Sequence, residues 1–471
     1  MKYELTGWKL KGLWPNELDF ARKNTDWAAG ATDWIDAAVP GGVHADLQAA
    51  GLIEDPLFDD NCLRCEWVEH RAWAYRCEMP VPEGQPAHAE LQFTGIDHDA
   101  EILVDGTPAA RVRGMFRTHI VDVTGRLRPG GTARVEAVFD PAPEEAPLYG
   151  YTARTHTQKP RFGYRWDFSA RLVNIGLYDR VFLRTYSFAA VRAAHIRTVP
   201  TDGGWQVRCE LTVEGFTERD ARWEASLGDT RVTVPVRVRP GIQQCDLVID
   251  AGERALWWPN GMGEQALYPL CVRLCDEQGE TDRYEQRVGF RTLTYARTEG
   301  APESALPYQA IVNGRPVFLK GVNFVPLHHL YGCADEATYR DRLTKARDAN
   351  VNAMRVWGGG MIEKEVFYDL CDELGILVWQ DFIQSSAGGF ADFPAKDPAF
   401  LALLRETATF AVQTRRNHVC LTYWCGGNEL TDDRYPGEER VPVGYEDANI
   451  ALLRGIEPDS NQQSSTSGVR W

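Results

Sequence analysis

Residues 421–430, LTYWCGGNEL, place a short apolar run directly before two glycines and the pair Asn428 and Glu429. The run is typical of a buried strand, and the glycines end it, so this pair is expected in the loop that follows. In parallel α/β folds that loop is where ligands bind. Glu429 is therefore a candidate catalytic carboxylate, with an ordinary solvated loop glutamate as the alternative.

The sequence on either side of this stretch alternates between apolar strands and amphipathic helices. The pattern predicts strands over 317–325, 352–357, 376–382 and 421–425, and helices over 336–350, 363–374, 400–417 and 445–456. Repeated β-α units of this kind require a parallel sheet covered by helices, either a barrel or a doubly wound sheet. No G-x-G-x-x-G or P-loop sequence opens the first helix, so nucleotide binding has no support.

Polar and aromatic side chains follow each of these four strands. In a (β/α)8 barrel all carboxyl ends of the strands open onto one face, where catalysis takes place. We therefore expect a shared site built from Asn323, Arg355, Trp357, Gln380, Asp381, Asn428 and Glu429.

Two β-rich regions precede the α/β pattern. From residue 2 to 186, short alternating runs separated by turn dipeptides indicate a sandwich or jelly roll. From 191 to 294, a second set of strands suits an immunoglobulin-like sandwich. Tryptophan is dense in the first region, and indole faces stack on sugar rings as well as filling cores, which favours a carbohydrate ligand.

Residues 161–176, RFGYRWDFSARLVNIG, are too rich in aromatic, charged and glycine residues for a plain strand. They predict a structured loop in which Trp166 and Phe168 flank Asp167. The alternative for this carboxylate is a salt bridge to Arg165 or Arg171.

Composition limits the classes of partner. With 44% apolar and 25% charged residues the chain of 471 residues is globular, and its formal charge of -16 disfavours nucleic acid and anionic membranes. The start of the sequence lacks a secretory signal, and no apolar run is long enough to span a bilayer. The 11 cysteines suit reduced thiols, so we expect a cytoplasmic protein. Neither Cys62 with Cys65 nor His328 with His329 has partners for a metal site.

Nine segments, in order along the chain, resemble glycoside hydrolase family 2, and within it the β-mannosidase branch. They are VPGGVHADLQAAGLIEDPLF (39–58), WAY (73–75), YRWDF (164–168), LWWPNGMGEQALY (256–268), GFR (289–291), FLKGVNFVP (318–326), RVWGGG (355–360), FYDLCDELGILVWQDF (367–382) and YWCGGNE (423–429). The resemblance implies a jelly-roll sugar-binding domain (1–186), an immunoglobulin-like sandwich (187–298) and the first half of a (β/α)8 TIM barrel (299–471).

The resemblance also implies roles for single residues in hydrolysis of a glycoside without a cofactor. Glu429 matches the acid/base and Asn428 the amide that holds the sugar 2-hydroxyl. The other residues expected at the sugar are Arg355, Trp357, Trp166 and Asp167. The chain departs from the family pattern at Phe168, at Ser169-Ala170 and at Gly427.

Retaining hydrolysis needs two carboxyl groups roughly 5 to 5.5 Å apart, one of them a proton donor with a raised pKa. Trp424 and Trp357 are expected to provide dry walls that raise the pKa of Glu429. A complete barrel takes roughly 250 residues, and the nucleophile of the resembling family comes from a later strand. We therefore expect the nucleophile to be missing from this chain.

The expected enzyme is an exo-β-mannosidase, inactive as the chain stands. The alternatives are another exo-β-glycosidase of the family (galactosidase, glucuronidase or glucosaminidase) and an inactive carbohydrate-binding fragment. The sequence does not predict an oligomeric state.

Overall fold

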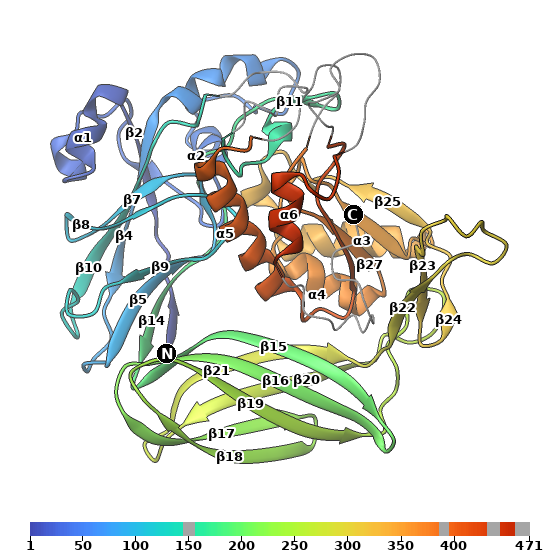
Figure 1. Cartoon of the computed structure of the whole chain (residues 1–471). Helices are drawn as coiled ribbons and strands as arrows, with labels where there is room; N and C mark the ends of the chain where they lie inside the picture. Colours follow the sequence, from blue (N-terminus) through green and yellow to red (C-terminus); the bar gives the residue numbers. More distant parts are fainter. Residues whose placement is uncertain (145–155, 386–394, 431–442, 457–471) are drawn as a thin grey trace.

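The computed structural model describes residues 1–144, 156–385, 395–430 and 443–456. Figure 1 shows a β-sandwich formed by the first part of the chain, a second sandwich along the lower edge, and a helix-covered sheet on the right. The hydrophobic core divides in the same way, with a separate main cluster inside each of the three regions.

The first region packs two antiparallel sheets face to face, as in a jelly roll. One sheet has the order β1-β14-β5-β9 and the other β3-β2-β4-β10-β7-β8. Their strands are β1 (Lys2–Glu4), β2 (Lys9–Leu13), β3 (Ile35–Asp36), β4 (Ala72–Pro80), β5 (His88–Phe93), β7 (Ala100–Val104), β8 (Thr107–Val112), β9 (His119–Asp122), β10 (Thr132–Phe139) and β14 (Val181–Tyr186).

Smaller elements of this region approach the α/β part of the chain. The strands β6 (Ile96–Asp97) and β13 (Gly176–Leu177) pair with each other, and β11 (Tyr164–Trp166) forms a hairpin with β12 (Ser169–Arg171). The helix α1 (Leu18–Ala21) lies on the outer side of this region, and α2 (Val43–Ala49) packs Val43 and Leu47 into its core.

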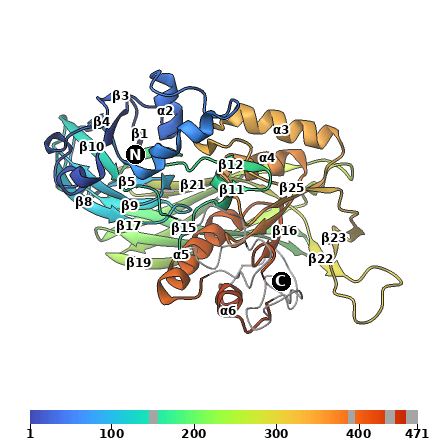
Figure 2. The same cartoon turned by 90° about the horizontal axis from the view of Figure 1, so that it is seen from above.

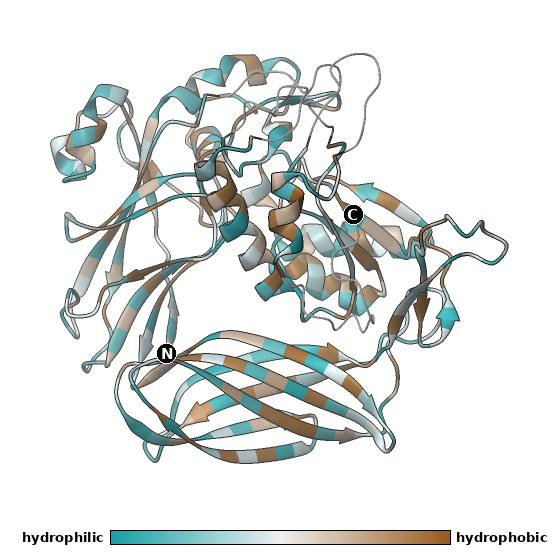
Figure 3. Ribbon diagram, in the orientation of Figure 1, coloured by the Kyte–Doolittle hydropathy of each residue, from teal (hydrophilic) through white to brown (hydrophobic). Residues whose placement is uncertain are grey.

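The middle region is a seven-stranded antiparallel sandwich of immunoglobulin type, with sheet orders β15-β16-β19 and β18-β17-β20-β21. Hydrophobic and hydrophilic residues alternate along its strands (Figure 3), because successive side chains of a strand point to opposite faces. Its strands are β15 (Ala189–Thr201), β16 (Gly204–Gly215), β17 (Arg219–Leu227), β18 (Thr230–Val238), β19 (Gly241–Gly252), β20 (Leu267–Cys275) and β21 (Glu280–Gly289).

A small antiparallel sheet leads into the third region. It consists of β22 (Leu293–Ala296), β23 (Gln309–Val312) and β24 (Arg315–Pro316). The four parallel strands that follow are β25 (Gly321–Phe324), β26 (Ala353–Val356), β27 (Leu377–Asp381) and β28 (Leu421–Cys425), in chain order across the sheet.

Helices connect these parallel strands, as the sequence predicts. They are α3 (Glu336–Asp348), α4 (Glu365–Leu374), α5 (Pro398–Arg415) and, after β28, α6 (Ala448–Arg454), which lies beside α5 in both views (Figures 1 and 2). Asp335 and Asp397 cap the first turns of α3 and α5 through their side chains. Gly375, with φ of 70°, ends α4 in the left-handed conformation that glycine favours.

The first predicted barrel strand is the one that differs most from the structure. The prediction covered 317–325, whereas β25 contains only Gly321–Phe324. The preceding residues turn out of the β23-β24 hairpin, and Phe318 is 84% exposed. An apolar run by itself does not separate a strand from the exposed turn that precedes it.

Candidate active site

Arg355 joins the carboxyl ends of the parallel strands. It lies on β26, and its Nη2 donates to Asp381 Oδ2 at 2.7 Å and to Asn428 Oδ1 at 2.9 Å. Its Nη1 reaches Asn323 Oδ1, on β25, at 3.4 Å. One guanidinium thus contacts side chains from the other three strands or the loops after them, which confirms the expected convergence for Asn323, Asp381 and Asn428. The expectation is wrong for Gln380, because its buried side chain accepts a hydrogen bond from Tyr368 on α4 at 2.6 Å.

Asp381 is the buried anion that fixes this guanidinium. Its side chain has no exposed surface, and besides Arg355 it accepts a hydrogen bond from the backbone N–H of Gly358 at 3.1 Å. Burial raises the pKa of Asp381, and the charge of Arg355 opposes that rise. The carboxylate therefore acts as a fixed counter-ion beneath the strand ends.

The same contacts orient the side-chain amide of Asn428. Because Asn428 Oδ1 accepts from Arg355, its NH2 group remains to donate to another partner. A donor at this place can bind a hydroxyl oxygen of a sugar. This geometry is compatible with the role expected for Asn428.

The loop that carries Asn428 is held by the segment after β27. Asn428 N donates to Gln384 O at 2.9 Å, and Gln384 Nε2 donates to Gly426 O at 2.8 Å. Gly427 has φ of 149°, and a Cβ atom there would lie 2.6 Å from the Gln384 carbonyl oxygen. This loop conformation consequently requires glycine at 427, where the chain departs from the family pattern.

Glu429 follows in the same loop but is exposed, with φ of 50°. The expectation that tryptophan walls bury this carboxylate is therefore wrong for the described residues. Trp424 is 2% exposed, and its ring stacks on Phe382 with centroids 5.1 Å apart. Its neighbour Tyr423 lines the open face of the sheet, and strand alternation turns Trp424 to the opposite face.

The β11-β12 hairpin of the first region covers Trp357. The ring centroids of Trp166 and Phe168 lie 5.0 and 5.7 Å from that of Trp357, each at a steep angle. Asp167 occupies the exposed turn between the two aromatic residues. The structure thus brings Trp166 and Trp357 together although 191 positions separate them in the sequence (357 minus 166).

The salt bridge considered for Asp167 is absent among the described residues. Arg171 pairs instead with the carboxylate of Glu69, which is buried. No ion pair joins Asp167 to Arg165 in the part of the chain that the structure describes. The alternative interpretation of Asp167 as a salt-bridge residue is therefore wrong.

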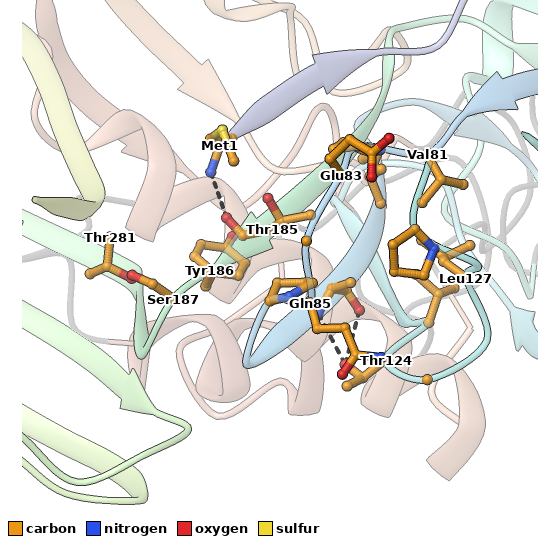
Figure 4. Close-up of a pocket in the computed structure, with 18 of the residues that line it drawn as sticks. Met1, Val81, Glu83, Gln85, Thr124, Leu127, Thr185, Tyr186, Ser187 and Thr281 are labelled. Carbon is orange, nitrogen blue, oxygen red and sulfur yellow. Dashed lines mark hydrogen bonds between the residues drawn. The ribbon is translucent and has the colours of Figure 1, made fainter. Parts of the chain in front are cut away.

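One cavity lies on the parallel sheet, and another lies beside the first region. A shallow one of about 390 Å³ lies on the open face of the parallel sheet and includes Asn323, Arg355, Trp379 and Tyr423. Another, of about 590 Å³, lies where the first sandwich meets the middle one (Figure 4). Exposed loop residues such as Glu83 and Gln85 form its rim, and none of the expected site residues lines it.

Among the described residues, one group combines side chains that could ligate a metal. Asp372, His418 and Cys420 are all buried, behind the sheet. His418 Nδ1 lies 2.7 Å from Asp372 and its Nε2 lies 3.0 Å from Glu365, so both ring nitrogens already have carboxylate partners. The arrangement is that of a buried imidazolium.

None of the described helices is long and apolar enough to cross a bilayer.

This chain is similar to known glycosidases. β-Mannosidase B of Thermothelomyces thermophilus is 32% identical over 430 residues, 86% of this chain and 48% of that protein. The rat β-mannosidase is 27% identical over 427 residues, 84% and 47% of the two chains. The chain spans about half the length of the curated relatives it matches.

Solved structures show the same likeness. The β-D-mannosidase of Dictyoglomus thermophilum superposes with a TM-score of 0.77 at 29% identity, covering 91% of this chain and 52% of that one. The exo-chitosanase of Amycolatopsis orientalis has a TM-score of 0.75 at 17% identity, covering 97% and 52%, and shows the fold alone.

Three family models match consecutive parts of the chain. The glycosyl hydrolase 2 galactose-binding domain-like model matches 20–179, the glycosyl hydrolases family 2 model 190–291, and the family 2 TIM barrel model 307–442. Together they account for most of the sequence, in the order of the three regions of the fold. The chain therefore belongs to glycoside hydrolase family 2.

Proposed function

We propose that this site belongs to a retaining exo-β-glycosidase that removes terminal β-D-mannose residues. The observation that carries the proposal is the cluster of Arg355, Asp381 and Asn428 beside Glu429, in a chain whose curated relatives are β-mannosidases. The other exo-β-glycosidases of the family are the second candidate, since an exo-chitosanase shares the fold.

In this proposal Glu429 is the acid/base. It protonates the leaving oxygen in the first step and activates water in the second. Glu429 is exposed in this structure, so a bound sugar would have to exclude the water around it. Asn428 donates to the sugar 2-hydroxyl, and Asp167 hydrogen-bonds the sugar from the hairpin side.

The nucleophile is not assigned to a described residue. Asp381 is the other carboxylate at these strand ends, but its oxygens accept hydrogen bonds from Arg355 and Gly358. An attacking carboxylate must present a free oxygen to the anomeric carbon. Hence we propose that residues 1–471 bind the glycoside without turning it over.

Calorimetric titration of the 471-residue chain with 4-nitrophenyl β-D-mannoside tests the substrate class. We expect the mannoside to bind more tightly than the matching galactoside, glucuronide and glucosaminide. Arg355→Met should weaken this binding at least about tenfold, equivalent to about 1.4 kcal/mol. Arg340→Met is the matched control, because Arg340 is an exposed residue of α3 that pairs with Glu336 on the same helix and with Glu373 on α4.

A preference for another glycoside would reassign the substrate, and absence of binding to all four would reject the proposed function. Release of nitrophenol is measured in parallel. Turnover by residues 1–471 that Glu429→Gln abolishes would show that a nucleophile is present, contrary to the proposal.

A further inference from the structure

A buried ion pair lies between the first sandwich and the parallel sheet. Lys159 and Asp97 are 2% and 1% exposed, and Lys159 Nζ lies 2.5 Å from Asp97 Oδ1. The remaining Asp97 oxygen accepts a hydrogen bond from the hydroxyl of Tyr331, which follows β25. The pair thus joins the first region directly to a loop at the carboxyl end of the parallel sheet.

A second connection runs through Asn174. Lys159 Nζ also donates to the carbonyl oxygen of Asn174 at 2.6 Å. The side chain of Asn174 in turn donates to the carbonyl oxygen of His329 at 2.9 Å. The Lys159 ammonium group therefore connects the segment that precedes the β11-β12 hairpin with the segment that follows it.

The residues near Lys159 in the sequence contact the loops that follow β26 and β27. Gln158 Nε2 donates to Ile383 O, after β27, at 3.1 Å. Arg161 N donates to Gly359 O, after β26, at 2.9 Å. The ring of Phe162 packs at a steep angle against that of Tyr331, after β25, with centroids 6.3 Å apart. Residues 158–162 therefore rest on the loops after three of the four parallel strands, and β11 begins two residues later.

An ion pair so deeply buried is an unusual way to hold two regions together. Removing two charges from water is costly, and a well-packed apolar pair is often at least as stable. Its advantage over apolar packing is directional, because the ammonium and carboxylate fix distances and angles. Fixed distances and angles matter most where the position of a hairpin over a site has to be defined.

We propose that Lys159 and Asp97 are positioning residues that set the β11-β12 hairpin over Trp357, and so place Trp166 and Asp167 at the sugar. This inference rests on the proposed function for its effect on sugar binding, but not for its effect on the hairpin. The Trp166-Trp357 ring contact, with centroids 5.0 Å apart, reports the hairpin position without any ligand.

The test compares Lys159→Met, Asp97→Asn and the double variant of the 471-residue chain. The part of the near-ultraviolet circular dichroism that Trp166→Phe removes from the parent chain defines the signal of the ring contact. We expect Lys159→Met to lose most of this signal and to bind 4-nitrophenyl β-D-mannoside at least about tenfold more weakly. Lys345→Met, which removes an exposed lysine paired with Asp341, should change neither.

Coupling distinguishes the pair from two independent residues. The double variant should regain part of the signal that Lys159→Met loses, because it leaves no buried charge without a partner. Should Lys159→Met fail to fold, Tyr331→Phe removes only the hydroxyl contact to Asp97 and should give a partial loss of the signal.

An unchanged ring-contact signal in all folded variants, together with a lower melting temperature, would reduce the pair to a structural role and overturn the proposal. If the parent chain binds none of the four glycosides, the proposed function fails, while the ring-contact signal still decides whether the pair positions the hairpin.

Discussion

At the scale of single residues, His418 shows how burial and charge oppose each other in this fold. It precedes β28 and lies between the carboxylates of Asp372 and Glu365. Burial alone would lower the pKa of His418, but the two carboxylates raise it to about 10. The cation then links α4 to the start of the strand that leads to Asn428 and Glu429.

The raised pKa of His418 predicts a dependence of stability on pH. The folded state binds the His418 proton more tightly than the unfolded state, whose pKa is near 6.5. The stabilisation is thus fully present below about pH 6.5 and is lost as pH rises through about 10. We expect the free energy of unfolding, measured in urea from pH 6 to 10, to fall with pH.

His418→Gln should remove this part of the fall. His70→Gln, which changes an exposed imidazole, is the control and should leave the pH dependence as it is. Parallel curves for His418→Gln and the parent chain would contradict the assignment of a buried imidazolium.

At the scale of elements, the β11-β12 hairpin contributes to the α/β site although it belongs to the first sandwich. Figure 1 shows β11 above the parallel strands, and Figure 2 shows the same arrangement from above. The two aromatic residues beside its turn contact Trp357, and the turn itself exposes Asp167. The aromatic side chains of the hairpin thus pack on Trp357, while the carboxylate that we propose to bind the sugar faces solvent.

This separation predicts the effect of Asp167→Ala. We expect an unchanged melting temperature, because the Asp167 side chain is exposed and no ion pair holds it among the described residues. Affinity for 4-nitrophenyl β-D-mannoside should fall by about 2 kcal/mol through loss of a charge-assisted hydrogen bond. Calorimetry and thermal unfolding together measure both quantities.

Asp202→Ala provides the matched control, since Asp202 occupies the exposed turn between β15 and β16, in the middle sandwich. A lower melting temperature for Asp167→Ala with unchanged affinity would return Asp167 to a structural role.

At the scale of the whole molecule, the middle sandwich contacts the helices that cover one face of the parallel sheet. Trp257 Nε1 donates to Asp372 O, on α4, at 2.8 Å. Asn417, after α5, donates to Ala194 O and accepts from Ile196 N, both on β15, at 2.9 Å each. These contacts make the sandwich part of the support for β28.

The opposite face of the parallel sheet is open. In the part of the chain that the structure describes, Trp379 is 40% exposed on this face. The edges of the described sheet are β25 and β28, and Val322 on the β25 edge is 46% exposed, with its side chain on the other face by strand alternation. Exposed edges with apolar side chains promote association between chains. We expect residues 1–471 to self-associate at micromolar concentrations in sedimentation velocity.

Val322→Lys places a charge on the β25 edge and should shift the chain toward monomer. Val248→Lys is the control, because Val248 is 49% exposed on β19, the edge strand of a different sheet. Equal effects of the two variants would show that the β25 edge is not where the chains meet.

The sequence by itself determined the elements, their order and the family. Strand and helix periodicities are local properties, so β26, β27, β28 and the helices between them were predictable to within a few residues. The convergence of Arg355, Asp381 and Asn428 was predictable too, because parallel strands in chain order bring their carboxyl ends to one edge. Four of the nine segments that resemble family 2 include the ends of the parallel strands, namely 318–326, 355–360, 367–382 and 423–429.

Only the tertiary structure decided which side chains meet and which face solvent. Arg171 pairs with Glu69, 102 positions away, rather than with Asp167. Glu429 is exposed, whereas Trp424 packs into the core behind the sheet. Ion-pair partners and burial depend on where distant segments of the chain pack, and no local pattern encodes this. The same holds for Lys159, whose buried partner comes from a strand 62 positions earlier.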